Sequence, residues 1–368
     1  MNQLEKAKER NVGLDALRIV SMLLIILLHS IDHSGVIEAA DATGGIISWY
    51  TRFLYILVQV CVNCYVLLSG YFLVESKFRL QKLVALWMEV VFYSLALRIV
   101  FITIGYKTFS IGSLVSCFVP IFTGRYWFIT IYFGLYLVSP FLSILIHAMT
   151  QKQHTTLNVV LFVLMSVMVS VSPSFKGMNS GAGWGLAWFV TLYLLAAWFR
   201  RYYQPTGKAV VKIAGWLGIA AVVTVLYEAG GVFSPLRSIA ANWYRYDSVP
   251  AYIMSLLVFT AFLNVEIECE AIKKMITLFA PATFGVYLIH AHADFSPWSW
   301  EVLALPEKMG NVWFPGVQIM AVLSIFVLCG LVDIARKNAV GKVENAFLLR
   351  DICTRIQNQF LQGFDDSK

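Results

Sequence analysis

The sequence predicts an all-α integral membrane protein, a bundle of about ten transmembrane helices around a central cavity. The first observation is the composition: the 368 residues are 59% hydrophobic and only 13% charged, with a mean hydropathy of +0.72. The second is a succession of apolar segments long enough to cross the hydrocarbon core. The third is the recurrence of ionisable side chains inside these segments, which lipid disfavours unless they face a cavity or a partner.

The apolar segments define the order of the predicted helices along the chain. They cover approximately residues 14–34, 46–73, 83–105, 126–147, 155–172, 184–200, 209–229, 248–265, 277–293 and 314–335. A further apolar piece, residues 111–122, is short and contains Pro120, so we expect it to be re-entrant or interfacial. If that piece crossed the membrane, the orientation of every later helix would be reversed.

The basic residues indicate how the bundle is oriented. With the N-terminus in the cytoplasm, most of the 28 Lys and Arg residues fall in cytoplasmic connections or tails, as the positive-inside rule expects. Both termini are therefore predicted to be cytoplasmic. Residues 1–336 form the predicted transmembrane domain, and residues 337–368 form a cytoplasmic tail whose apolar side chains recur at the spacing of an amphipathic helix.

Composition also bears on the expected partners. A net charge of +7 would indicate nucleic acid only if the basic residues gathered in one hydrophilic patch, and they do not. We therefore expect membrane lipid as a partner and no nucleic acid, and the oligomeric state stays open. Cys61 and Cys64 have metal-like spacing but lie in an apolar segment without a second pair, so no metal is expected.

The first predicted helix carries ionisable side chains along one face. Asp15 precedes Arg18 by three residues, which allows an ion pair on the helix surface. Arg18 and His29 are about three turns apart, so they share a face at a separation of about 16 Å along the axis. His33 extends this face to the outer end. The alternative is an arginine that snorkels to the headgroups and a histidine that hydrogen-bonds a neighbouring helix.

Polar side chains in other segments are candidate partners for this face. They are Arg52, Gln59 and Asn63 in the second segment, Glu89 and Arg98 in the third, and Tyr287 and His290 in the ninth. An ionisable residue inside a membrane is a functional candidate by default. The sequence therefore predicts a wet or ligand-filled interior with His29 as its reactive group.

Several motifs together resemble the acyltransferase-3 family of membrane-bound O-acyltransferases. LDALRIVSMLLIILLH is similar to the arginine and histidine signature of the family's first span, and LLSGYFL to the Ser-Gly-Phe type sequence that closes the second. KFRLQK, YWFIT and GVYLIH resemble further family motifs in the same order, so the resemblance covers nearly the whole chain. Tyr71 replaces the commoner phenylalanine, which is a mild departure.

The resemblance implies transfer of an acetyl group from cytosolic acetyl-CoA to a hydroxyl of an extracytoplasmic glycan or lipid-linked sugar, in the bacterial cytoplasmic membrane. A succinyl or other acyl group is an open alternative. The residues expected to hold the coenzyme A phosphates at the inner face are Arg18, Lys77, Arg79 and Lys82, and Asp15 belongs to the same predicted site as the partner of Arg18. His29 is expected either to act as the general base or to carry the acyl group itself.

The remaining site candidates would stabilise the oxyanion or bind the acceptor. The candidate oxyanion donors are Ser69, Tyr287, His290 and a backbone amide near Gly70. The candidate acceptor-binding residues are His33, Tyr126, Trp127, Trp243, Arg245, Trp298 and Trp300. Helix packing by small residues is the alternative for Ser69 and Gly70, and interfacial anchoring is the alternative for the aromatic residues.

Two other functions compete with acyl transfer. A transporter or flippase for a small polar or lipid-linked substrate would use the same histidines and arginines as a proton relay. The chain lacks the internal duplication of spans that many such proteins show. A structural bundle that scaffolds an envelope-synthesis complex is the third candidate, and it requires no reactive histidine.

Overall fold

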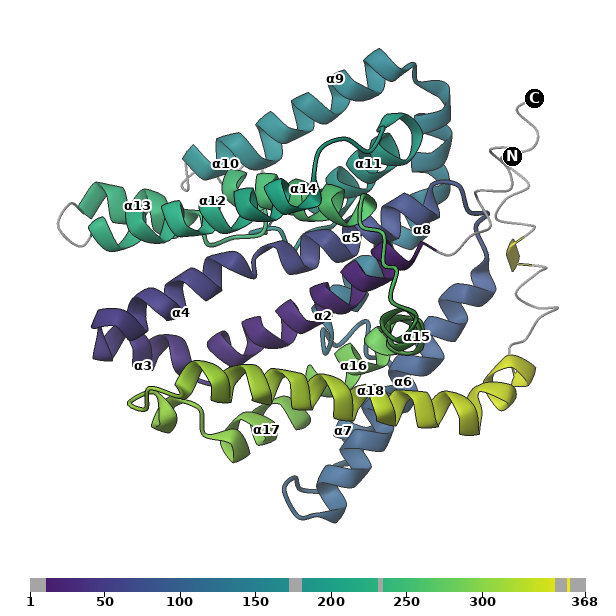
Figure 1. Ribbon diagram of the computed structural model, residues 1–368. Coiled ribbons are helices and arrows are strands. Elements are labelled where there is room, and N and C mark those ends of the chain that lie inside the picture. The colour runs from purple at the N-terminus through teal and green to yellow at the C-terminus, as the bar shows by residue number, and fades with distance from the viewer. Residues whose placement is uncertain (1–10, 172–180, 231–233, 348–355, 358–368) are drawn as a thin grey trace.

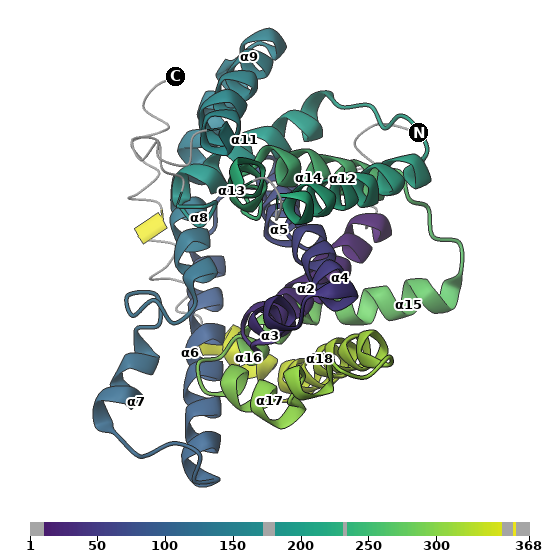
Figure 2. The same cartoon turned by 90° about the vertical axis from the view of Figure 1, so that its left-hand side faces the viewer.

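The computed structural model describes residues 11–171, 181–230, 234–347 and 356–357. Within these residues the elements are helices and no strand is present. The central elements are α2 (Val12–Asp32), α4 (Gly45–Leu57) and α5 (Val60–Leu73). Figures 1 and 2 show them between a layer that contains α11 (Leu186–Tyr202), α12 (Ala209–Ala229) and α14 (Val249–Leu263) and a layer that contains α16 (Thr283–His290) and α18 (Phe314–Phe347).

The described residues contain eight helical stretches that are long and apolar enough to cross a membrane. They are Val12–Asp32, Gly45–Leu73, Leu80–Thr103 (α6), Trp127–Ala148 (α8), Gln151–Val171, Ala209–Ala229, Glu270–His290 and Phe314–Ala339. The stretch Gln151–Val171 consists of α9 (Gln151–Phe162), a π-helical turn (Val163–Val167) and α10 (Met168–Val171). Each stretch coincides with one of the predicted segments, which confirms an all-helical protein with many apolar spans.

The other two predicted segments, 184–200 and 248–265, also form helices, but shorter ones. Helix α11 has 17 residues and α14 has 15. At about 1.5 Å per residue these helices are about 26 and 23 Å long, less than a hydrocarbon core of about 30 Å. The prediction of about ten spanning helices thus stays a prediction for these two elements.

Two predicted spans are interrupted helices. Between α4 and α5 the chain makes short-range hydrogen bonds, from Gln59 N to Ile56 O (3.2 Å) and from Cys61 N to Val58 O (3.0 Å). Between α15 (Glu270–Phe279) and α16 lies a 3₁₀ turn at Ala280–Ala282. Pro281 in that turn has no amide hydrogen to donate, so the α-helical ladder cannot continue through it. Both interruptions lie inside segments that look like single helices in the sequence.

Two other elements refine the predictions about segment 111–122 and the tail. Residues Ile111–Phe118 form α7, a helix of only 8 residues. Its length of about 12 Å is too short to cross the bilayer. Helix α18 continues without a break to Phe347, past the predicted boundary between residues 336 and 337. Most of the predicted amphipathic tail beyond Phe347 lies outside the described residues.

Burial separates the central helices from the periphery. In the most apolar stretch of α4 and α5, 67% of the residues are buried inside the protein, against 22% in α6. Gly70 lets α5 approach α11, because a Cβ atom there would lie 2.9 Å from Ala196 Cβ and 3.1 Å from Tyr193 Cα. Helix α2 in turn packs against α5, α14, α16 and α18. Side chains on α2 are therefore surrounded by protein on several sides.

Candidate active site

Helix α2 carries the predicted ionisable residues at its two ends. At its start, Asn11 accepts a hydrogen bond from Leu14 N (3.0 Å) and so satisfies one of the free amides of the first turn. Arg18 Nη1 lies 3.0 Å from Asp15 Oδ1, which confirms the expected pair. His29 lies near the other end of the helix, and His33 caps its backbone with a hydrogen bond to His29 O (2.9 Å).

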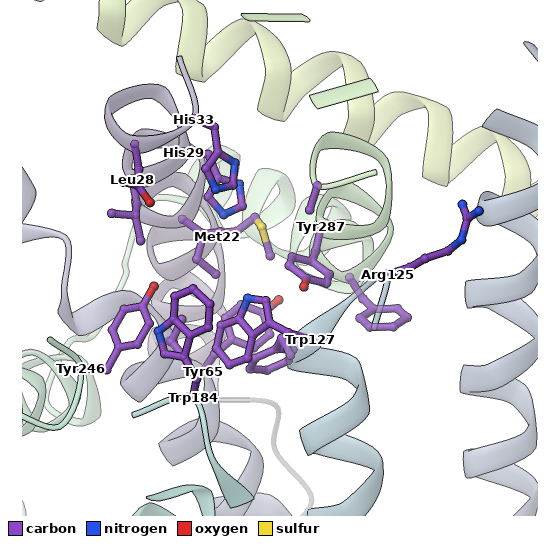
Figure 3. A pocket seen from close by; sticks show the side chains of 16 residues that line it. Met22, Leu28, His29, His33, Tyr65, Arg125, Trp127, Trp184, Tyr246 and Tyr287 are labelled. Atoms are coloured by element: carbon purple, nitrogen blue, oxygen red, sulfur yellow. The ribbon is translucent and has the colours of Figure 1, made fainter. Parts of the chain in front are cut away.

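His29 and His33 line a cavity of about 260 Å³ at the end of α2 that is predicted to face outward, the outer cavity. Met22, Ile25, Leu28, Asp32, Val62, Tyr65, Arg125, Trp127, Phe128, Trp184, Tyr246, Phe284, Tyr287 and Ala291 complete its wall. Figure 3 shows Tyr246, Trp184 and Trp127 in a row on the side opposite the two histidines. The sequence predicts one central cavity that Arg18 and His29 share, and the outer cavity is lined by His29 but not by Arg18.

Three imidazole rings lie next to one another at this cavity. The ring of His33 stacks on that of His29, with centroids 4.3 Å apart and an interplanar angle of 17°. The ring of His290 lies on another side of His29, with centroids 5.1 Å apart and an angle of 42°. Among the described residues, no group of three or more His, Cys, Asp or Glu has the arrangement of a metal site.

Arg18 lines a second cavity of about 270 Å³ at the end of α2 that is predicted to face the cytoplasm, the inner cavity. Its wall also contains Tyr65, Ser69, Leu86, Phe128, Tyr132, Ala280, Pro281, Thr283 and Phe284. Tyr65, Phe128 and Phe284 line both cavities. The arginine end and the histidine end of α2 thus open into two adjoining cavities that share an aromatic wall.

Two hydrogen bonds at Tyr65, one of its hydroxyl and one of its backbone oxygen, fix this residue in the shared wall. The Tyr65 hydroxyl lies 2.6 Å from Thr283 Oγ1, which connects α5 to α16. The Ser69 hydroxyl donates to Tyr65 O (2.9 Å) on the preceding turn of α5. Ser69 therefore lies with Arg18 in the inner cavity, and not with His29. Its position does not support the predicted role of Ser69 as an oxyanion donor to chemistry at His29.

The aromatic row of the outer cavity comes from three separate segments. Trp127 at the start of α8 stacks on Trp184, with centroids 4.9 Å apart and an angle of 14°, and lies parallel to Tyr246 at 6.4 Å. Gly183 permits this approach, because it has a φ of +87° and a Cβ atom there would lie 2.6 Å from Tyr246 Cβ. Burial raises the pKa of the Tyr246 hydroxyl well above its ordinary value, so this wall stays neutral.

Two of the predicted oxyanion donors lie on α16 but differ in access. Tyr287 lines the outer cavity, and its ring lies 6.0 Å from that of His290. His290 is not part of the cavity wall and is 1% exposed. Its Nδ1 atom lies 2.7 Å from Val286 O, and its Nε2 atom is buried without a hydrogen-bond partner. The structure therefore favours Tyr287 over His290 for contact with a ligand.

The basic residues that follow the second span do not join Arg18. Lys77, Arg79 and Lys82 are exposed and line neither the outer nor the inner cavity. Lys77 instead borders a separate cavity with Glu75, Phe78 and His147 on the inner side. The single phosphate site expected from these residues together is therefore not formed in this conformation of the chain.

Most predicted acceptor-binding residues of the outer loops also lie away from the cavity. Arg245 pairs with Asp247 at 2.9 Å, and Trp298 packs on Phe101 at 5.6 Å. Trp243 and Trp300 are absent from the cavity wall, and Trp300 is buried. Tyr126 is buried, and its hydroxyl donates to Leu288 O at 2.9 Å. Of the predicted set, only His33 and Trp127 line the outer cavity.

Several intramembrane polar residues have structural partners instead of facing a cavity. Asn63 donates to Tyr246 O (2.8 Å) and accepts from Trp188 Nε1 (2.9 Å). Ion pairs also join Arg52 to Asp41, Arg98 to Asp294 and Arg336 to Glu89. The contacts of Asn63, Arg98 and Arg336 join segments that are distant in the sequence, whereas Arg52 and Asp41 lie on consecutive helical segments. The sequence analysis takes Asn63, Arg52 and Arg98 as evidence for a cavity. In the structure, hydrogen bonds and ion pairs to other parts of the protein explain why these polar side chains lie in apolar segments.

Sequence reasoning also missed part of the cavity wall. Trp184, Arg125, Tyr65, Phe128 and Phe284 received no role, although all five line the outer cavity. A usable signal existed for Arg125 and Phe128, because both flank or belong to the YWFIT motif. Trp184 lies in a Gly-rich stretch directly before α11 and has no local signal, because only the fold brings it to Trp127.

Comparison with known proteins identifies the family of the chain. A family model described as an acyltransferase domain, Acyl_transf_3, matches residues 11–335 of the chain. No curated protein and no solved structure gives a significant match. The matched region includes α2 and both cavities, and it covers most of the chain. The protein therefore belongs to the acyltransferase-3 family and is a multi-pass membrane acyltransferase.

Proposed function

We propose that the protein transfers an acetyl group from cytosolic acetyl-CoA to a hydroxyl of an extracytoplasmic glycan or lipid-linked sugar, in the cytoplasmic membrane of a bacterium. The observation that carries this proposal is the pair of adjoining cavities along α2, one lined by Arg18 and the other by His29. A donor in the cytoplasm and an acceptor outside the membrane need a site that each can reach from its own side, and two adjoining cavities along one helix provide such a site. Family membership supports the acyl-transfer chemistry.

The inner cavity is the proposed place of the donor arm. Arg18 can bind an anionic group of coenzyme A by charge-assisted hydrogen bonds, since its guanidinium group keeps donors beyond the one used for Asp15. From Arg18 to His29 the distance along the helix is about 16 Å. A thin pantetheine arm can cover this distance while the charged nucleotide stays outside the bilayer. The arm has to pass Tyr65, Phe128 and Phe284, which both cavities share.

His29 is the proposed base in the outer cavity. In direct transfer, its unprotonated ring nitrogen accepts the proton of the acceptor hydroxyl while that oxygen attacks the thioester carbonyl carbon. The carbon–sulfur bond then breaks, and the proton passes from His29 to the departing thiolate, which gives the ester and the coenzyme A thiol. In the two-step alternative, His29 itself attacks the thioester and carries the acyl group. Tyr287 is the proposed donor to the oxyanion.

The aromatic row is the proposed binding surface for the acceptor. Trp127, Trp184 and Tyr246 present a neutral wall opposite the histidines. The apolar C–H face of a pyranose ring packs well against such rings, while polar groups around the cavity can bind its hydroxyls. Asp32 and His33 are polar residues available for this purpose, whereas the Arg125 guanidinium donates to Ser116 Oγ (2.6 Å) and points away from the cavity (Figure 3).

A vesicle experiment with separated substrates tests the proposal. The purified protein is reconstituted into sealed liposomes with labelled acetyl-CoA inside and a crude envelope glycan outside. We expect labelled acetyl ester on the external glycan, detected by mass spectrometry, together with coenzyme A thiol inside. Protein-free liposomes and liposomes loaded with succinyl-CoA are the controls, and the latter measure the choice of acyl group.

Two results would contradict transfer across the membrane. The first is entry of the glycan or of a labelled sugar into the vesicles without any acetyl ester, which would favour a transporter. The second is ester formation only when donor and acceptor share one compartment of intact vesicles. Either result would contradict the assignment of donor and acceptor to opposite sides of the membrane. It would not affect the family membership, because that rests on the sequence match.

A further inference from the structure

We propose that His290 is a positioning residue that holds the hydrogen of the His29 ring on Nδ1, so that Nε2 of His29 stays unprotonated and faces the outer cavity. This inference rests on the proposed role of His29 and adds the residue that sets its protonation pattern. It replaces the role of oxyanion donor that the sequence suggested for His290. Three geometric observations lead to it.

The first observation fixes the hydrogen of His290. Its Nδ1 atom lies 2.7 Å from the backbone oxygen of Val286. A carbonyl oxygen can only accept, so Nδ1 is the nitrogen that carries the hydrogen in neutral His290. The other nitrogen, Nε2, then holds a lone pair. That atom is shut away from solvent and has no hydrogen-bond partner.

The second observation concerns the two nitrogens of His29. Its Nδ1 atom is also buried and unpartnered, although the residue lines the cavity. The nitrogen that can reach a cavity ligand is therefore Nε2. Nδ1 of His29 and Nε2 of His290 are unpartnered nitrogens on adjoining rings. A hydrogen bond in which Nδ1–H of His29 donates to the lone pair of His290 Nε2 would give each nitrogen a partner. The ring centroids are 5.1 Å apart. This structure contains no hydrogen bond between the two nitrogens, and the proposed one requires a rotation of the neighbouring rings that turns them toward each other.

The third observation excludes His33 as the competing partner of Nδ1. The rings of His33 and His29 are nearly parallel, with an angle of 17° at 4.3 Å. Hydrogens and lone pairs of imidazole nitrogens lie in the ring plane, so stacked rings cannot hydrogen-bond through their faces. The ring of His290 is inclined by 42° to that of His29, so the two rings are not stacked and a hydrogen bond in the ring planes is not excluded in the same way. Of the two adjoining rings, His290 is thus the remaining candidate partner.

The consequence is a chain from a backbone oxygen to the reactive nitrogen. Val286 O sets the tautomer of His290, and His290 sets that of His29. The opposite tautomer of His29 would present an N–H group to the cavity and could accept no proton from an acceptor hydroxyl. A general base contributes about 10² to 10⁴ in rate, and this contribution depends on the correct tautomer.

Two substitutions at His290 separate positioning from packing. His290→Gln keeps an acceptor oxygen near the place of Nε2, whereas His290→Phe keeps an aromatic ring of similar size without any acceptor. We expect His290→Phe to lower turnover by about 10²-fold with little change in the KM for the donor, and His290→Gln to restore about tenfold of that loss. Nitrogen-15 NMR of histidine-labelled protein in detergent should show the Nδ1–H tautomer of His29 in the native chain and a mixture in His290→Phe.

The outcomes distinguish this inference from the proposed function. If His29→Ala leaves acetyl transfer intact, the proposed function fails, whatever the tautomer of His29. If His29 is required but native His29 carries its hydrogen on Nε2, the inference about His290 is wrong. Equal losses in His290→Gln and His290→Phe, with an unchanged His29 tautomer, would also overturn it, since packing alone would then explain both losses.

Discussion

The outer and inner cavities are nearly equal in volume, about 260 and 270 Å³, yet their walls differ in chemistry. The outer wall contains two histidines and a row of neutral aromatic rings. The inner wall contains one arginine together with hydroxyl groups of Ser69, Tyr132 and Thr283. Helix α2 and its C-cap supply Arg18, His29 and His33, and Arg125, shortly before α8, is also part of the outer wall. This difference supports the proposal that the inner cavity receives an anionic group of the donor and that proton transfer takes place in the outer cavity.

The largest effect is expected at the histidine of the outer cavity. His29→Ala should lower the rate of acetyl transfer by about 10²- to 10⁴-fold, since it removes the proposed base or acyl carrier. Initial rates with labelled acetyl-CoA measure this loss. His147→Ala is the matched control, because His147 is an exposed histidine at the inner end of α8 that lines neither of the two cavities. Comparable activity of both variants would contradict the assignment of the outer cavity.

The next effect is expected at the arginine of the inner cavity. Arg18→Gln should raise the KM for acetyl-CoA by about 10- to 100-fold with a smaller change in kcat, because a charge-assisted hydrogen bond contributes about 1.5–3 kcal/mol. Lys152→Gln removes a positive charge from an exposed inner position of α9 and serves as the control. A loss confined to kcat would mean that Arg18 acts in the chemical step and not in donor binding.

A smaller effect is expected at the wall between the cavities. Phe284→Trp should lower kcat/KM for the donor by about tenfold, because the larger ring would narrow the proposed passage past Tyr65 and Phe128 from one cavity to the other. Phe284→Ala should instead raise the release of coenzyme A thiol without acceptor, since it admits water to the thioester. A thiol-reactive dye follows both reactions. Unchanged kinetics in both variants would show that the donor does not pass this wall.

The smallest effect is expected at the aromatic row. Trp184→Ala should raise the KM for the glycan by about 2- to 10-fold and leave the KM for acetyl-CoA unchanged, because one aromatic contact contributes about 0.5–1.5 kcal/mol. The control is Trp313→Ala, which removes an indole that is 74% exposed in a predicted outer loop. A larger change for the donor than for the glycan would reverse the proposed roles of the two cavities.

Local patterns predicted the positions of the apolar helices and the face of α2 that carries Arg18 and His29. Both predictions depend on periodicity within one helix, which the α-helical geometry sets over a few turns. Asn63 and Arg98 show where this reasoning failed. Each is polar inside an apolar segment, but each is paired with a distant residue, Trp188 and Asp294 respectively. Polarity alone cannot tell a cavity-facing side chain from one that joins two helices.

By itself, therefore, the sequence determined that the chain is a helical membrane protein and that an arginine and a histidine lie along one face of its first helix. Only the tertiary structure decided which side chains surround them: Trp184 and Tyr246 opposite His29, His290 beside it, and Phe284 between the two cavities. The physical reason is range. Apolar periodicity and helix geometry act between neighbours in the sequence, whereas a cavity wall is built by side chains that close packing brings together from distant helices.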